Sequence, residues 1–455
     1  MKKLLLTFSL IALTSTINAQ WTVQGTGFSS GSRGISDIFI MDANNVWGLA
    51  YDGTPGSTTV VQEFTRTTDG GANWVPGTID IGDTTLGIND LSPVNINAAW
   101  ISAINGTSGA GSSIWKTTNG GGLWTQQNAA GYTNAASFID GVHFFNANVG
   151  VSYGDPAPTP TTFEIYRTID GGSNWTSVTS PAINSGDYGY NSGFTFAGNS
   201  IWFGTAKGKV YRSIDMGATW TKLNSPIADF GGSLTAVSGK MYFSDANNGI
   251  LIANTLSGTT AGSTVTARTL YKTANGGSTW TSSGTYTQPY TFNICYIPGT
   301  TILVGNGATT GTTPVQSTGY SLDNGSTWTQ YDSGTQRTSI AFLNPNLGWA
   351  GGFSDPDPLV TAGIFKFSGT LGLDNSASIA KFKVYPNPAT SVVTISTPDV
   401  DSANLSVTDI SGKVVMTKSL NGIENTVDIS NLSSGAYFFE VSSASKKEVV
   451  KILKN

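Results

Sequence analysis

The sequence predicts an all-β protein, a seven-bladed β-propeller followed by a small Ig-like β-sandwich. First, a motif that ends in Trp, five residues after an Asp or Asn, recurs six times at intervals of 50, 51, 45, 60 and 48 residues. Second, only 11% of the residues are charged, and the 56 glycines accompany many Ser, Thr and Asn, as in turn-rich β proteins. Third, each interval contains short alternating apolar runs. Four such runs in a period near fifty are typical of a propeller blade.

The recurring motif has the chemistry of a tight turn that leads into a packed strand. Its Asp or Asn caps backbone N–H groups two residues later, and the glycines that follow adopt positive φ with little steric cost. The Trp ring then buries roughly 200 Å² against neighbouring strands. We therefore expect a structural role, and no ligand, for Asp69, Asn119, Asp170, Asp215, Asn275, Asp323, Trp74, Trp124, Trp175, Trp220, Trp280 and Trp328.

Each unit repeats one order of elements. In the first unit an alternating run over 37–40 precedes a turn at 42–45, a second strand over 46–50, a third over 60–66 and a fourth that opens at Trp74. Seven units are predicted because second-strand centres recur at Trp47, Trp100, Val151, Trp202, Leu251, Val304 and Trp349.

The seventh unit, 339–367, lacks the motif and the strand that should follow it. The pair Trp-Thr opens the outer strand after five of the six motifs, and the same pair begins the segment Trp21–Gln24. We therefore predict that this segment completes the last blade, because a closed ring leaves no free sheet edge.

The ends of the chain predict export. Residues 1–19 have a basic start, an apolar run to Leu13 and a small residue, Ala19, before the expected cut, which is typical of a signal peptide too short to span a membrane. No later apolar run approaches transmembrane length. The propeller is expected over 20–369, a linker over 370–381 and the sandwich over 382–455.

The repeats resemble the Asp-box (BNR) repeats of sialidases, sortilin-type receptors and some glycoside hydrolases. The fuller pattern, Asp-Ile-Phe-x-x-Asp-Ala-Asn-x-x-Trp from Asp37 and then Arg-Thr-Thr-Asp-Gly-Gly-x-x-Trp from Arg66, is most similar to propellers of the photosystem II assembly-factor type. The resemblance covers most of 20–369. It implies the fold and leaves the function open, since these families include enzymes, receptors and chaperones.

The tail carries four motifs in order: Lys383–Pro388, Val407–Lys413, Leu432–Tyr437 and Lys446–Lys451. They resemble the type A C-terminal sorting domain of the type IX secretion system. The resemblance implies a sandwich-like domain that carries its cargo across the outer membrane of Bacteroidetes-type bacteria, with the secretion machinery as partner. The protein would then be released or held at the cell surface on lipopolysaccharide. The alternative is an ordinary accessory β-sandwich.

Composition excludes several functions. The chain has 23 Lys and Arg against 28 Asp and Glu, a net charge of −5, which argues against nucleic acid as a partner. His143 and Cys295 are the only His and Cys, so neither a His/Cys metal cage nor a His-dependent triad is expected. Cys295 lies in an apolar run and is expected to be a buried strand thiol. No metal or cofactor is predicted, and bound calcium stays an open question.

Candidate binding residues lie on one face of the ring. Because antiparallel strands alternate in direction, the repeated turns lie opposite the loops between second and third strands and the connections between blades. Variable loops on a rigid scaffold are the usual place for binding, and carboxylates among aromatic rings can hydrogen-bond to and stack on sugars. The candidates are Asp37, Asp90, Asp140, Asp155, Tyr188, Tyr190 and Asp355. The alternative is that these aspartates only cap strands and turns.

Two classes of glycan-cleaving enzyme each require particular residues. A sialidase-like site needs three arginines to hold a carboxylate, and four of the six arginines lie on or just before third strands, which leaves Arg33 and Arg337. A glycosidase needs two carboxyls about 5 to 9.5 Å apart, which here means Asp37 with Asp90 or Asp140. A secreted, non-catalytic module that binds a glycan or a protein is favoured. A glycoside hydrolase and an assembly role are the alternatives.

Overall fold

The computed structural model describes residues 21–54, 59–105, 111–127, 132, 137–156, 161–260, 263–307, 317–352, 363–369, 371, 383–397, 402–443 and 447–455. The chain divides into two compact units, one ending at Leu371 and one beginning at Gly372. This division falls within the segment 370–381 that we predict to be a linker. The predicted signal peptide lies outside the described residues.

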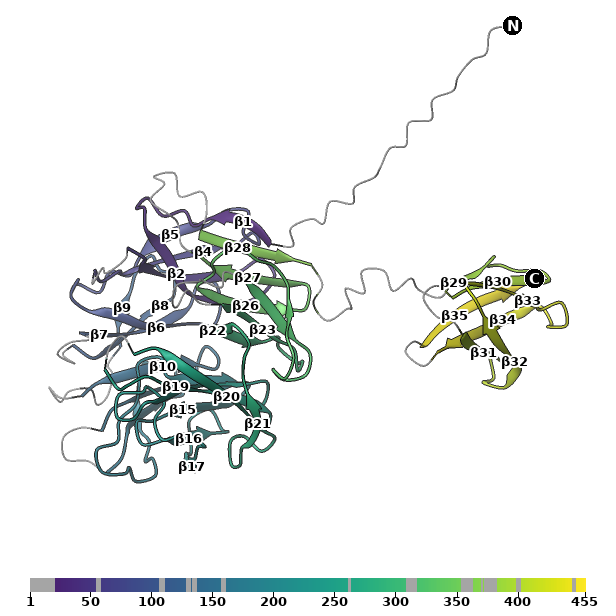
Figure 1. Cartoon of the computed structure of the whole chain (residues 1–455). Helices are drawn as coiled ribbons and strands as arrows, with labels where there is room; N and C mark the ends of the chain where they lie inside the picture. The colour runs from purple at the N-terminus through teal and green to yellow at the C-terminus, as the bar shows by residue number, and fades with distance from the viewer. Residues whose placement is uncertain are drawn as a thin grey trace, which may run out of the picture. The chain divides into compact units, whose positions relative to one another are not determined.

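In the described part of the first unit, seven four-stranded antiparallel sheets follow one another around a ring, which confirms the seven-bladed propeller (Figure 1). Blade 1 comprises β2 (Arg33–Ile40), β3 (Val46–Asp52), β4 (Glu63–Thr67) and β5 (Val75–Thr78). Blade 2 comprises β6 (Gly87–Pro93), β7 (Ala99–Ile104), β8 (Ser113–Thr117) and β9 (Thr125–Gln126), and blade 3 comprises β10 (Ile139–Phe144), β11 (Gly150–Gly154), β12 (Glu164–Thr168) and β13 (Thr176–Ser177). Blade 4 comprises β14 (Phe194–Ala197), β15 (Ser200–Gly204), β16 (Lys209–Ser213) and β17 (Thr221–Asn224), and blade 5 comprises β18 (Val237–Phe243), β19 (Gly249–Leu256), β20 (Val265–Thr273) and β21 (Thr281–Thr285). Blade 6 comprises β22 (Tyr290–Tyr296), β23 (Leu303–Gly307), β24 (Thr318–Ser321) and β25 (Thr329–Gln330).

The seventh blade is assembled from both ends of the propeller. Three of its strands come from the end of the unit: β26 (Ser339–Asn344), β27 (Leu347–Gly351) and β28 (Gly363–Ser368). The fourth is the N-terminal strand β1 (Trp21–Gly25), which pairs along its whole length with β28. The predicted ring closure is thus confirmed, and β1 lies beside β28 in Figure 1.

The repeated turns are held by local hydrogen bonds. Asp69 Oδ1 accepts the hydroxyl of Thr67 at 2.8 Å and the backbone N–H of Asn73 at 2.9 Å. Gly70 and Gly71 have φ of 70° and 88°, which only glycine adopts without strain. The Gly70 N–H donates to the Asn44 carbonyl at 3.0 Å, so this turn lies beside the turn between the first two strands. Both turns therefore lie at the same end of the blade, as strand alternation requires.

In the described part of the propeller, a basic residue near the end of the third strand joins every blade except blade 6 to the next one. Lys116 Nζ donates to the Gly171 carbonyl at 2.8 Å and lies over the Trp100 ring. The other basic residues that donate to carbonyls of the following blade are Arg66, Arg167, Arg212, Lys272 and Lys366. These charges therefore hold the ring together.

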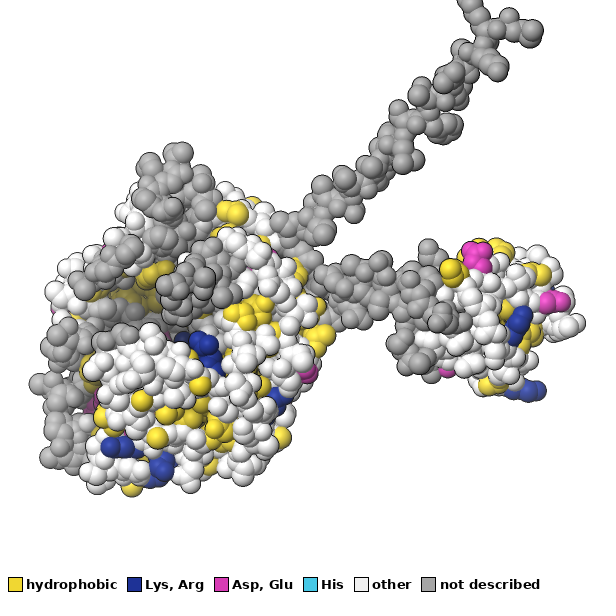
Figure 2. Space-filling view, viewed as in Figure 1, with side chains coloured by type: hydrophobic (Ala, Val, Ile, Leu, Met, Phe, Trp, Pro, Cys, Tyr) yellow, Lys and Arg dark blue, Asp and Glu magenta, His cyan; other side chains and the backbone are white. Residues whose placement is uncertain are grey.

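The apolar core of the propeller lies between neighbouring blades. Trp47 and Phe64 of blade 1 share one cluster with Leu91 and Trp124 of blade 2. The largest fully buried side chains include the second-strand tryptophans Trp47, Trp100, Trp202 and Trp349. On the side shown in Figure 2, charged side chains are sparse.

The second unit is a two-layer sandwich, as predicted. One sheet has the order β29 (Lys383–Tyr385), β30 (Val392–Ser396) and β33 (Glu424–Asp428). The other has the order β32 (Val414–Asn421), β31 (Ser402–Asp409), β34 (Gly435–Ser442) and β35 (Lys447–Lys454). Val393 and Ile395 of the first sheet pack in one core with Leu405 and Phe439 of the second.

Candidate functional site

Inner strands of blades 1, 4, 5 and 6, together with the connections before β14 and β18, line a cavity of about 470 Å³, which we call the mouth cavity. This volume is within the range of small-ligand sites. A smaller cavity of about 160 Å³ adjoins it, because Asp37, Ser192 and Phe194 line both. The charged, amide and aromatic side chains that line the mouth cavity include Asp37, Tyr190, Phe194, Lys240, Tyr242 and Asn293.

Asp37 and Lys240 occupy the same position in the inner strands of blades 1 and 5. Each lies five residues before the Asp of its following turn, Asp42 or Asp245. In the sheet, Asp37 is opposite Leu49 and Lys240 is opposite Ile252. The repeat therefore delivers a carboxylate and an ammonium to one cavity from different blades.

Asp37 and Lys240 interact electrostatically across the mouth cavity. Desolvation raises the pKa of Asp37, and a hydrogen bond from Ser36 and the charge of Lys240 partly reverse this shift. Desolvation lowers the pKa of Lys240, and the charge of Asp37 opposes that shift. Lys240 Nζ donates a long hydrogen bond of 3.4 Å to the Phe292 carbonyl, which leaves other donor positions for a ligand.

Asp90 lies deeper, in the wall of the smaller cavity. Its Oδ2 accepts the Ser102 hydroxyl at 3.2 Å and the Val142 N–H at 3.3 Å, and the residue is 8% exposed. Burial raises the pKa of Asp90 to about 7, against hydrogen bonds that lower it, and the charge of Asp37 raises it further. Asp90 is therefore partly protonated at neutral pH.

The part of the smaller cavity next to Asp90 is lined by aromatic, uncharged side chains. The ring of His143 stacks on Phe196 with centroids 4.0 Å apart, and burial lowers the pKa of His143 to about 3. Cys295 on β22, which we expect to be buried, is half-buried and lines neither cavity, and desolvation raises the pKa of its thiol to about 12. Both groups are neutral at physiological pH.

Asp140 and Asp155 line neither cavity and belong to a buried acidic cluster whose charges also include Asp90. Asp140 lies at a bulge of β10, one position out of register with Asp37 and Asp90, and is 1% exposed. Asp155 Oδ1 accepts the Gly189 N–H at 2.6 Å, and Asp140 lies against the same glycine. These carboxyls therefore support the connection 187–193. Among the described residues, no group of three His, Cys, Asp or Glu is placed to hold a metal ion.

Tyr188 and Tyr190 are both tied to the connection that precedes β18. The Tyr190 hydroxyl donates to the Asp229 carboxylate, and the Tyr188 hydroxyl lies 2.5 Å from Ser233 Oγ. The Tyr190 ring lies against Gly231 and lines the mouth cavity. Of the predicted site residues, the structure thus brings Asp37, Asp90 and Tyr190 to the two cavities. Asp355 lies outside the described residues.

Lys240 and Asn293 were missed by the sequence reasoning. The signal for Lys240 was its spacing of five residues before Asp245, which matches Asp37 before Asp42. Asn293 is opposite Asn306, next to the bulge of blade 6. The turn that follows has no Asp five residues later, so the sequence does not show that Asn293 occupies the position of Asp37 and Lys240.

The acidic cluster predicts a dependence of stability on pH. Burial, then Asp155 and Asp90, raise the pKa of Asp140 well above its ordinary value, and desolvation raises that of Asp155 to about 6. A carboxyl with a raised folded-state pKa stabilises the fold fully below its unfolded value, and this contribution is lost as pH rises through the folded value. Asp140→Asn should therefore stabilise the protein at pH 8 by about 1–3 kcal/mol, because a neutral amide avoids the desolvation cost of a carboxyl that ionises as pH rises, and by less at pH 5.

Melting curves at the two pH values test this prediction. Because the pKa of His143 is lowered, this residue destabilises the fold as pH falls, opposite to Asp140. The quantity to follow is therefore the difference in stability between variant and wild type at each pH. Asp80→Asn, at an exposed aspartate, is the matched control and should change little at either pH. An Asp140→Asn protein less stable than wild type at pH 8 would contradict the assignment.

Comparison with known proteins identifies the tail. Residues 383–455 match the secretion-system C-terminal sorting domain family. The fold and this tail together define a class, the β-propeller proteins that carry a type IX sorting domain. This protein is therefore exported by type IX secretion to the cell surface or the extracellular space. Among the described residues, no helix is long and apolar enough to cross a membrane.

Solved propellers resemble most of the chain. YCF48 bound to a D1 peptide is 16% identical with a TM-score of 0.49, over 77% of this chain and 97% of that one. YCF48 from Cyanidioschyzon merolae is 14% identical with a TM-score of 0.49, over 76% and 98%. The GH74 xyloglucanase from Xanthomonas campestris is 14% identical with a TM-score of 0.48, over 83% and 59%. No curated protein sequence matches the chain.

Proposed function

We propose that the propeller is a non-catalytic module that binds a glycan or protein ligand in the mouth cavity, outside the cell. The observation that carries the proposal is the meeting of Asp37, Lys240 and Asn293, from three blades, on one cavity. Basic residues near the ends of third strands bond to the following blade instead, as Lys116 and Lys366 do. Polar groups that converge on a cavity without serving the fold are the usual mark of a binding site.

A glycoside hydrolase is the second candidate, favoured by one observation. Asp90, with a pKa of about 7, and Asp37 both line the 160 Å³ cavity, and glycosidases pair a protonated with an ionised carboxyl. However, Asp90 is buried and its Oδ2 already accepts two hydrogen bonds. Asp140, the other predicted partner, is 1% exposed and lines neither cavity. Binding without catalysis therefore agrees better with the geometry.

A sialidase-like site finds little support. Arg33 Nε lies 2.8 Å from Glu63 Oε2, and Arg337 Nη1 lies 2.6 Å from Asp332 Oδ2. Both of the arginines that sequence reasoning left available are thus in ion pairs. A substrate carboxylate would have to displace these partners.

The test compares ligand retention by two lysine variants of the full chain. Lys240→Ala should weaken binding to polysaccharide or peptide libraries at least about tenfold, since a hydrogen bond to a charged group contributes about 1.5–3 kcal/mol. Lys207→Ala, an exposed lysine outside the mouth cavity, is the control and should bind like wild type. Equal binding by all three proteins would contradict the proposal. Release of reducing ends that Asp90→Asn abolishes would favour the hydrolase instead.

A further inference from the structure

The two charged side chains that line the mouth cavity, Asp37 and Lys240, have opposite signs. Asp37 and Lys240 lie on different walls, and each shifts the proton affinity of the other toward its charged form. A ligand with a net charge would meet one attractive and one repulsive group in this space. A neutral ligand leaves the opposite charges balanced and avoids an uncompensated charge in a partly desolvated site.

The hydrogen-bonding groups of the cavity suit hydroxyls. A carboxylate only accepts hydrogen bonds, an ammonium only donates them, and an amide does both. The side-chain amide of Asn293 makes no hydrogen bond to other described residues, and Lys240 keeps donor capacity beyond its 3.4 Å contact. A hydroxyl both donates and accepts, so a row of hydroxyls can satisfy all three side chains together.

The remaining wall is aromatic. Phe194, Tyr190 and Tyr242 line the mouth cavity, and the phenol of Tyr190 is fixed by Asp229. Aromatic rings held in place offer flat apolar surface at a small cost in conformational entropy. A saturated ring with C–H groups on one face and hydroxyls at its edge matches both walls.

We infer that the mouth cavity binds a neutral sugar residue of a glycan, with its hydroxyls on Asp37, Lys240 and Asn293 and its ring against the aromatic wall. This inference rests on the proposed binding function and narrows its ligand. It also predicts the selectivity of charge variants. Without Asp37 the remaining lysine should favour an anionic sugar, and without Lys240 the remaining aspartate should favour a cationic sugar.

Calorimetric titration of the full chain with three sets of methyl glycosides tests this selectivity. The probes are neutral hexosides, the corresponding uronates and the corresponding 2-amino sugars. Wild type should bind neutral probes at least tenfold more tightly than either charged set. Asp37→Asn should improve uronate binding at least fivefold, and Lys240→Gln should improve amino-sugar binding to a similar degree. Asn293→Ala should weaken all probes about equally.

The outcomes separate this inference from the broader function. Wild-type preference for a charged sugar, or variants that leave selectivity unchanged, would overturn the neutral-sugar inference while sugar binding at the site stands. Retention of peptides and of no sugar would overturn it and leave a protein ligand for the proposed function. Melting temperatures within a few degrees of wild type, with Lys207→Ala binding normally, show that any loss is local. No ligand of either kind would overturn both proposals.

Discussion

Removal of residues 21–25 is expected to lower the melting temperature of the propeller more than any other change considered. The lost strand pairs with β28 from Trp21, opposite Phe367, to Gly25, opposite Gly363. Its loss would expose a strand edge in blade 7 and remove the non-covalent strand pairing that joins the two ends of the ring. Trp21 also packs edge-on against Phe342 and Phe367.

Single substitutions in this strand separate packing from pairing. Trp21→Ala should destabilise the protein by about 3–5 kcal/mol, as large core aromatics do. Val23→Ala, in the same strand but 53% exposed, should change stability by less than about 0.5 kcal/mol. Urea unfolding and thermal melting provide the measurement. An unchanged melting curve after removal of 21–25 would show that the ring does not depend on this closure.

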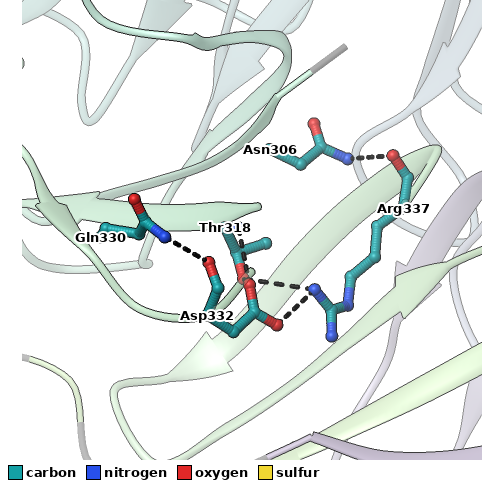
Figure 3. A network of polar contacts seen from close by, with 5 residues as sticks. All are labelled: Asn306, Thr318, Gln330, Asp332 and Arg337. Carbon is teal, nitrogen blue, oxygen red and sulfur yellow. Dashed lines mark hydrogen bonds and ion pairs between the residues drawn. The ribbon is translucent and has the colours of Figure 1, made fainter. Parts of the chain in front are cut away.

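The second large effect is expected at the ion pair between Arg337 and Asp332, which lies against Trp21 of the closing strand β1. Figure 3 shows Asp332 between Arg337 and Thr318, with Nη1 of Arg337 2.6 Å from Asp332 Oδ2. Asp332 Oδ1 accepts the Thr318 N–H at 2.7 Å and also its hydroxyl. The Arg337 guanidinium lies over the ring of Trp21, 4.6 Å from its centroid. The network therefore links blade 6 to the strand that closes blade 7.

Asp332→Ala should destabilise the protein by about 3–5 kcal/mol, because it leaves the Arg337 cation, only 3% exposed, without its partner. The double variant Asp332→Ala/Arg337→Leu should recover part of this loss, since it removes the unpaired charge. Urea unfolding of the wild type and the variants measures both. A double variant less stable than Asp332→Ala alone would mean that Arg337 contributes mainly through its contacts with Trp21 and Phe365.

The features of the fold that could be predicted from sequence are those that depend on short, repeated sequence motifs. The Asp-Gly-Gly turns, the second-strand tryptophans and the Trp-Thr start of outer strands depend on neighbours close in the chain. Their spacing therefore predicted the number of blades and the closing role of Trp21. The four tail motifs likewise predicted the domain that the sorting-domain family matches.

The candidate site was less predictable, because it depends on register and on distance around the ring. Asp140 resembles Asp37 and Asp90 in sequence, yet one residue of offset at a bulge places it in a buried cluster. Lys240 is 203 positions from Asp37 in the chain, and only the closed ring brings them to one cavity. In the same way, the contact of the Arg337 guanidinium with the ring of Trp21, at the other end of the propeller sequence, depends on closure of the ring.

By itself, then, the amino-acid sequence determined the architecture, since repeated turns and strand patterns are local properties that each unit expresses independently. It also determined the export route, through motifs confined to the tail. Only the tertiary structure decided which polar side chains meet in the mouth cavity and which are consumed in holding the blades together. The physical reason is that a one-residue shift in strand register changes the surroundings of a side chain, and that partners across the ring are set by closure and not by separation along the chain.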